Sequence, residues 1–213
     1  MNEATGCEWW SFDLATPQRS FGLHLELVRW PAAGRAWCWT GVLEAGRPLV
    51  TVVETDIAAP RAGFDWRAQG LWVEVVVEAP GRRWSVGLEA FALALDDPAD
   101  ALGACRGERI PLGYDLEWET EGGLDHPLGA AHGEVLIGAA AYEVAGDGGA
   151  RFTRGPFPPE APAPSRSGRA GALGWSPARL PHPDRPDRTL AVARTLHGAG
   201  WSEVEPVGPS GPG

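Results

Sequence analysis

The chain of 213 residues has no lysine, one methionine and only three cysteines. Cys7, Cys38 and Cys105 are widely spaced and form no CxxC pair, so they indicate neither a zinc site nor a disulfide framework. We expect buried, reduced thiols, with no metal ion and no cofactor. No stretch reaches the roughly 18 consecutive apolar residues of a membrane-spanning helix, so we expect no membrane span.

The first residues of the chain bear on its expected location, and its charge bears on its expected partners. Residues 1–7 lack both a basic region and an apolar run, so they do not have the pattern of a signal peptide, and we expect a cytoplasmic protein. Residues 1–146 carry 22 acidic residues against 10 arginines, a balance of −12, whereas residues 147–213 carry 6 against 8, a balance of +2. An acidic body repels phosphate backbones, so nucleic acid is not an expected partner.

Tryptophan, in contrast, is abundant, and nine of the 11 tryptophans precede Asp147 on segments with the alternation of short strands. The segment from Phe21 to Val28 alternates apolar residues with His24 and Glu26, which is typical of a half-buried strand. The same pattern predicts further strands, about eight in all, over residues 37–43, 49–53, 71–78, 84–95, 112–120 and 133–137.

This strand pattern predicts an all-β antiparallel barrel or sandwich over residues 7–146, interrupted only by a short helix over residues 96–103. From Asp147 the alternation disappears, and 12 of the 20 prolines lie in the last 67 residues. Proline-rich runs such as residues 156–164 cannot form the hydrogen-bonded ladders of a sheet. We therefore predict a Pro-, Gly- and Arg-rich tail over residues 147–213 that is mostly disordered. A weak helix over residues 189–196 is the one element expected there.

Large rings at every second position line one face of a sheet, and closing that sheet makes the face a wall for an extended apolar ligand. Trp37 and Trp39 point the same way on one strand, and Trp72 and Trp84 lie on strands expected to be neighbours. Ordinary core packing explains the pattern about as well. The candidate ligand-binding residues are Trp37, Trp39, Trp72, Trp84 and Trp118.

Three segments carry a family resemblance: Arg47 to Val53, Arg83 to Ala99, and Gly113 to Glu119 followed by His132 to Gly138. They resemble the lipocalin-like hydroxyneurosporene synthase (carotenoid hydratase) family, in particular its uncharacterised actinobacterial-type branch, over roughly residues 8–146.

The resemblance implies a chain of two lipocalin-like barrels, of which this chain holds mainly the first. It also implies, for some members, the addition of water across an isoprenoid double bond. The family's Arg-Asp-His-Ser-Trp-Gly motif is replaced here by Arg151-Phe-Thr-Arg-Gly155. We therefore expect the C-terminal part to be divergent or translated in a shifted reading frame.

Acid-catalysed hydration needs a protonated carboxylic acid in an apolar pocket, aromatic faces beside the cation and a held water. Asp56 lies at the end of an apolar strand, and Glu54 is on the same face of that strand. Asp56 could therefore lie at the rim of a barrel mouth, although a solvated strand-end carboxylate is the simpler interpretation. His132 and Glu134 share a strand face and could form a hydrogen bond for acid–base work, or could be an exposed polar face. Asp56, His132 and Glu134 are the candidate catalytic residues.

Three functions thus remain open. The leading hypothesis is a lipocalin-like domain that binds an extended apolar ligand, isoprenoid or lipid-like. The alternatives are a hydratase-type lyase and a non-catalytic truncated remnant of such an enzyme. The sequence does not decide whether the protein is an enzyme, nor does it give the oligomeric state.

Overall fold

A computed structural model describes residues 6–17, 21–44, 47–60, 63–95, 106–120 and 128–156, together with three strands between residues 178 and 204. Ten strands form one antiparallel sheet: β1 (Gly6–Ala15), β2 (Phe21–Trp30), β3 (Arg35–Glu44), β4 (Leu49–Ala58), β5 (Asp65–Ala68), β6 (Leu71–Ala79), β7 (Arg83–Leu95), β8 (Gly107–Thr120), β9 (Leu128–Ile137) and β10 (Ala140–Pro156). A second sheet contains β11 (Ala178–His182), β12 (Arg185–Thr195) and β13 (Gly198–Val204). A single 3-10 turn (Pro31–Ala33) joins β2 and β3.

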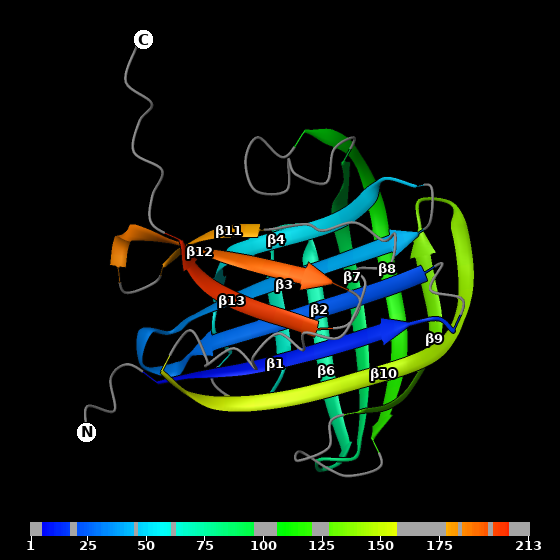
Figure 1. Ribbon diagram of the computed structural model, residues 1–213, viewed down its shortest axis with the longest axis horizontal. Helices are drawn as coiled ribbons and strands as arrows, with labels where there is room; N and C mark the ends of the chain where they lie inside the picture. Colours follow the sequence, from blue (N-terminus) through cyan, green and yellow to red (C-terminus); the bar gives the residue numbers. More distant parts are fainter. Residues whose placement is uncertain are drawn as a thin grey trace.

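The large sheet curves back on itself. Its strand order is β4-β3-β2-β1-β10-β9-β8-β7-β6-β5, and a three-residue ladder between β4 and β7 joins its two halves again. Strands β1 to β4 run across β6 to β8, so the ring is flattened into two crossing layers (Figure 1). The prediction of an all-β antiparallel barrel or sandwich is confirmed. None of the described residues form a helix long and apolar enough to cross a membrane.

Strand β10 makes one corner of this ring. It pairs with β9 through residues 140–149 and with β1 through residues 147–156, so it passes from one layer to the other. Glycines permit the close approach: a Cβ atom on Gly146 would lie 2.1 Å from the carbonyl oxygen of Ala15, and one on Gly148 would lie 2.7 Å from the carbonyl carbon of Ala130. Strands that switch layers commonly turn such corners at glycines and bulges.

This corner corrects the predicted boundary at residue 146. Strand β10 continues to Pro156, and Ala150 is buried in the core, so the expected loss of strand structure from Asp147 is wrong for residues 147–156. The weak helix predicted over residues 189–196 is also wrong, because β12 occupies residues 185–195. The helix predicted over residues 96–103 lies outside the described residues.

The core lies between the two layers, on the inner face of the ring. Alternate residues of all ten strands contribute to one continuous apolar cluster. Aromatic rings fill part of it: Phe12 lies 5.2 Å from Trp118 and 6.4 Å from Trp84 between ring centroids, and Trp10 lies 4.8 Å from Phe64. Apolar burial of this extent supplies most of the stabilisation of a single sheet-built domain.

Candidate functional site

One end of the ring is the principal candidate site. At this end β2, β4, β8 and β10 begin and β3, β7 and β9 end, and cross-strand pairs such as Val50 with Ala94 keep the strands together. Several inner-face apolar side chains here remain partly exposed, although those farther inside are buried. We call this set the barrel mouth; its members are Val52, Ala94, Ile110, Ile137 and Tyr142.

The local sequence of β7 keeps the inward side chains short near the mouth. Its inner positions toward the mouth are Ala90, Ala92 and Ala94, all within the core cluster or packed against it. A methyl group extends little from the sheet, so a run of inward alanines leaves room that leucine or phenylalanine would fill. The bulky residues of the same segment stand at the alternate positions, where Phe91 is exposed on the outer face.

The rim of the mouth carries a polar group. The Tyr142 hydroxyl donates a hydrogen bond to Oε2 of Glu44 at 3.1 Å, and the Tyr142 ring lies 5.8 Å from that of Phe21. Desolvation and the neighbouring Glu44 carboxylate raise the pKa of Tyr142 above its ordinary value of 10.0, so the hydroxyl stays a neutral donor. Arg47 faces the same carboxylate, with Nε 3.8 Å from Oε2.

An ion-paired cluster lies at the opposite end of β1 and β2. Arg29 Nε donates to Oε2 of Glu8 at 2.8 Å, and Arg154 pairs with the other oxygen. The Arg29 guanidinium also lies 5.6 Å from the centre of the Trp10 ring. Burial alone would raise the pKa of Glu8, but the hydrogen bonds and charges of the two arginines outweigh it and lower that pKa. Glu8 is therefore ionised at neutral pH and unsuited to donate a proton.

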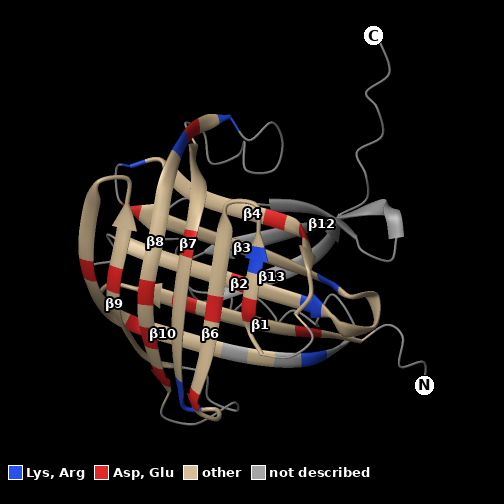
Figure 2. Cartoon of the chain, turned by 180° about the vertical axis from the view of Figure 1, so that it is seen from behind, with Lys and Arg blue, Asp and Glu red and all other residues tan. Residues whose placement is uncertain are grey.

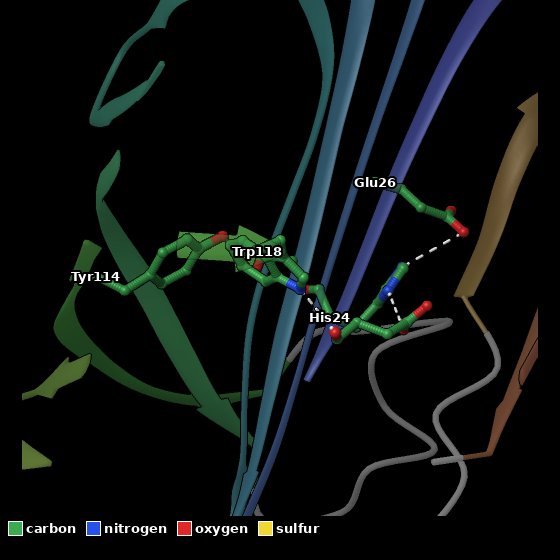
Figure 3. Close-up of polar contacts among 6 residues, drawn as sticks. His24, Glu26, Tyr114 and Trp118 are labelled. Atoms are coloured by element: carbon green, nitrogen blue, oxygen red, sulfur yellow. Dashed lines mark hydrogen bonds and ion pairs between the residues drawn. The ribbon is translucent and has the colours of Figure 1, made fainter. Parts of the chain in front are cut away.

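A polar link crosses the core between the layers (Figure 3). Thr40 donates its hydroxyl proton to the backbone oxygen of His24 at 2.7 Å, so the Tyr114 hydroxyl, 3.1 Å away, is the donor to Thr40. Burial raises the pKa of Tyr114 well above 10.0 and keeps it neutral. Burial, then the charge of Glu54, raises the pKa of the Cys38 thiol, which makes it unreactive.

On the outer side of the same wall, an imidazole lies between two carboxylates. His24 Nδ1 lies 2.9 Å from Oδ1 of Asp13, and His24 Nε2 lies 3.3 Å from Oε1 of Glu26 (Figure 3). The ring of Trp39 meets the imidazole edge-on, with centroids 4.9 Å apart. The sequence placed His24 and Glu26 on the polar face of a half-buried strand; the structure buries both.

A groove of about 380 Å³ lies on the outer face of β6 to β9. Gly87 and Gly113 line this groove. The Trp72 indole covers Gly87, where an added Cβ would lie 3.2 Å from Cη2 of the indole ring. Figure 2 shows acidic residues spread over this face. Those lining the groove are Glu74, Glu89, Asp115 and Glu134. Among the described side chains, no group of three or more His, Cys, Asp or Glu residues is arranged to hold a metal ion.

These features were compared with known proteins. No protein-family model, curated protein or solved structure matches this chain. The resemblance to the carotenoid hydratase family therefore rests on the sequence segments alone and stays a prediction.

The three candidate catalytic residues lie outside the mouth. Asp56 is near the far end of β4, with a side chain that is 83% exposed and 3.3 Å from Arg35. His132 and Glu134 share a face of β9, as expected, but the partner of His132 is Glu117, at 3.9 Å. Strands β4 and β9 are not neighbours in the sheet, so the structure does not assemble these residues into one site.

The five candidate ligand-binding tryptophans occupy three different places, so the expected shared wall is wrong. Trp84 and Trp118 are on the inner face but are packed around Phe12, away from the mouth. Trp37 and Trp39 do point the same way, but toward the outer side. Strands β6 and β7 are neighbours, yet Trp72 lies on the outer face.

Sequence reasoning missed the mouth because it followed the largest rings. Val52, Ile110, Ile137 and Tyr142 are ordinary apolar residues of predicted strands or of segments where no strand was expected. The signal that could have located the mouth is the alternation of small residues at 90, 92 and 94, since inward alanines mark the thin part of a core.

Proposed function

We propose that this protein binds an extended apolar molecule, isoprenoid or lipid-like, through the barrel mouth. The observation that carries the proposal is the partial exposure of Val52, Ala94, Ile110 and Ile137 on the inner face. Most other apolar side chains of that face are buried, and apolar side chains kept open to solvent within a ring of paired strands are typical of a ligand site. Burial of these groups by an apolar ligand would be favourable by roughly 25 cal/mol per Å².

The rim supports a ligand with one polar end. The Tyr142 hydroxyl uses its proton on Glu44 but keeps an acceptor lone pair, and the Glu44 carboxylate can accept a second hydrogen bond. A ligand hydroxyl at the rim would find acceptors there while its apolar body lies against Ile110 and Ile137. An isoprenoid alcohol has this form.

The test is a fluorescence titration with all-trans-retinol, read by tryptophan quenching. Ala94→Phe places a ring in the mouth and should weaken binding at least tenfold, about 1.4 kcal/mol. The matched control is Val76→Phe, which adds the same ring on the outer face, where Val76 is 46% exposed; its affinity should equal that of the wild type.

A second variant guards against misfolding of Ala94→Phe. Ile137→Ala removes apolar contact without adding bulk and should weaken retinol binding about tenfold. Unchanged affinity in both mouth variants, or no saturable quenching by the wild-type protein, would overturn the proposal. A loss in Val76→Phe equal to that in Ala94→Phe would move the site to the outer face.

The proposal is limited to binding. Hydration would need a protonated acid beside the ligand, whereas Asp56 is exposed at the far end of β4 and Glu8 is held ionised by Arg29 and Arg154. The hydratase alternative keeps only its support from the family resemblance. Turnover of an isoprenoid substrate that falls in Asp56→Asn or His132→Ala would restore it.

A further inference from the structure

The two outer faces of the ring differ in exposure. The outer face of β6 to β9 carries large apolar side chains in contact with solvent: Val76, Phe91 and Leu136. The outer face of β1 to β4 instead buries a second apolar cluster: Cys7, Trp9, Val28, Trp30, Trp37 and Trp39. A sheet face that packs on nothing cannot bury its indoles, so something covers this face. We call this cluster the outer tryptophan face.

Two polar residues of the same face are also buried. Glu26 is only 2% exposed, and the His24 imidazole lies between its carboxylate and that of Asp13. Charged groups taken out of water are costly unless they are paired. The burial of His24 and Glu26 on a sheet face therefore indicates that this face is covered at these two residues, whereas the side chain of Asp13 is 45% exposed.

The chain itself supplies a segment at the right place. Strand β10 ends at Pro156, which is paired with Gly6, beside Cys7 at the edge of the outer tryptophan face. The remaining residues, 157–213, contain β11, β12 and β13. Figure 1 shows these strands crossing β2 to β4, and in Figure 3 His24 and Glu26 project from the wall toward the C-terminal strands.

The C-terminal sheet also needs a partner. Its strands pair in the order β11-β12-β13. A sheet of three short strands has little stability of its own without packing against another layer.

We infer that residues 157–213 dock β11 to β13 as a third layer on the outer tryptophan face of the same chain. The chain then has two apolar cores, one inside the ring and one between β1 to β4 and the C-terminal sheet. This interface does not depend on ligand binding at the mouth, because the two sites lie on opposite sides of the wall formed by β1 to β4.

Coverage can be tested in the full chain by cysteine alkylation, with Cys105→Ser to remove the third thiol. Cys7 is 2% exposed on the outer tryptophan face and Cys38 is 1% exposed inside the ring. N-Ethylmaleimide should modify both about 100-fold more slowly than a control cysteine, Val76→Cys, since labelling requires local opening. Modification of Cys7 at the rate of the Val76→Cys thiol would overturn the inference.

The occupant can be tested by photo-cross-linking from p-benzoylphenylalanine in place of Trp37, in an equal mixture of isotopically labelled and unlabelled full chains. The inference predicts cross-links within one chain to peptides of residues 157–213. The same probe in place of Val76, on the open face, should give none to those peptides. Cross-links between labelled and unlabelled chains would identify a second copy as the occupant, and absence of cross-links to residues 157–213 would equally contradict the inference.

Discussion

The corner in β10 makes the sharpest distinction between this structure and a barrel that ends at residue 146. The perturbation is Gly146→Ala, the smallest possible addition. Its Cβ would lie 2.1 Å from the carbonyl oxygen of Ala15 and 2.7 Å from the carbonyl carbon, distances that side chains do not adopt. Because both obstacles are backbone atoms paired in β1, they cannot rotate away, and the β10–β1 ladder must shift.

The magnitude follows from this geometry. Overpacking of a well-formed core costs about 1–3 kcal/mol, and a backbone clash more than 1 Å inside ordinary contact belongs at the upper end. For a chain of this size, about 3 kcal/mol corresponds to a fall in Tm of roughly 6–12 °C. Gly113→Ala is the matched control, since its nearest atom would be 3.5 Å away, and its stability should change by less than about 0.5 kcal/mol.

The assay is thermal unfolding followed by circular dichroism at neutral pH, on wild-type protein, Gly146→Ala and Gly113→Ala. If residues beyond 146 were an unpacked tail, the alanine at 146 would be as harmless as the one at 113. A Tm for Gly146→Ala within about 2 °C of that of Gly113→Ala would therefore refute the corner.

Two further predictions concern the core. Glu8→Gln should cost about 3 kcal/mol in urea unfolding at pH 7, because it leaves Arg29 partly buried and unpaired. Since the folded-state pKa of Glu8 is lowered below 4.5, this advantage should be complete above that pH and lost as pH falls through the folded-state pKa; a pH-independent difference would contradict it. Tyr114→Phe should cost about 1 kcal/mol, and Thr40→Val more, because it removes the acceptor of the Tyr114 hydroxyl together with the hydrogen bond that Thr40 donates to the His24 carbonyl. Equal costs in urea unfolding would argue against the link.

The regular parts of the fold were predictable from the sequence, because period-two alternation with one buried face is a local property. Phe21 to Val28 and the six other predicted segments all lie within strands. Strands β1, β5 and β10 were missed for physical reasons. Strand β1 is buried on both faces and hides its alternation, β5 has four residues, and β10 contains glycines that serve a corner but have the composition of a linker.

The candidate site was less predictable, because the burial of each face depends on what packs there. The sequence gives the spacing of Trp37, Trp39 and Trp84 but not which face turns inward. His24 has the pattern of a surface residue because its strand alternates. The structure nevertheless buries it, because burial depends on what covers the outer face of β2, and no local pattern in β2 contains that information.

The central claim is that an apolar molecule enters the ring at its mouth, and the most direct test is photolabelling with a benzophenone-tagged isoprenoid alcohol, mapped by mass spectrometry. The account predicts saturable labelling of Ile110, Ile137 or Tyr142, which excess untagged alcohol suppresses. Labelling confined to Trp72 and Leu136 on the outer groove, or labelling that does not saturate, would contradict it.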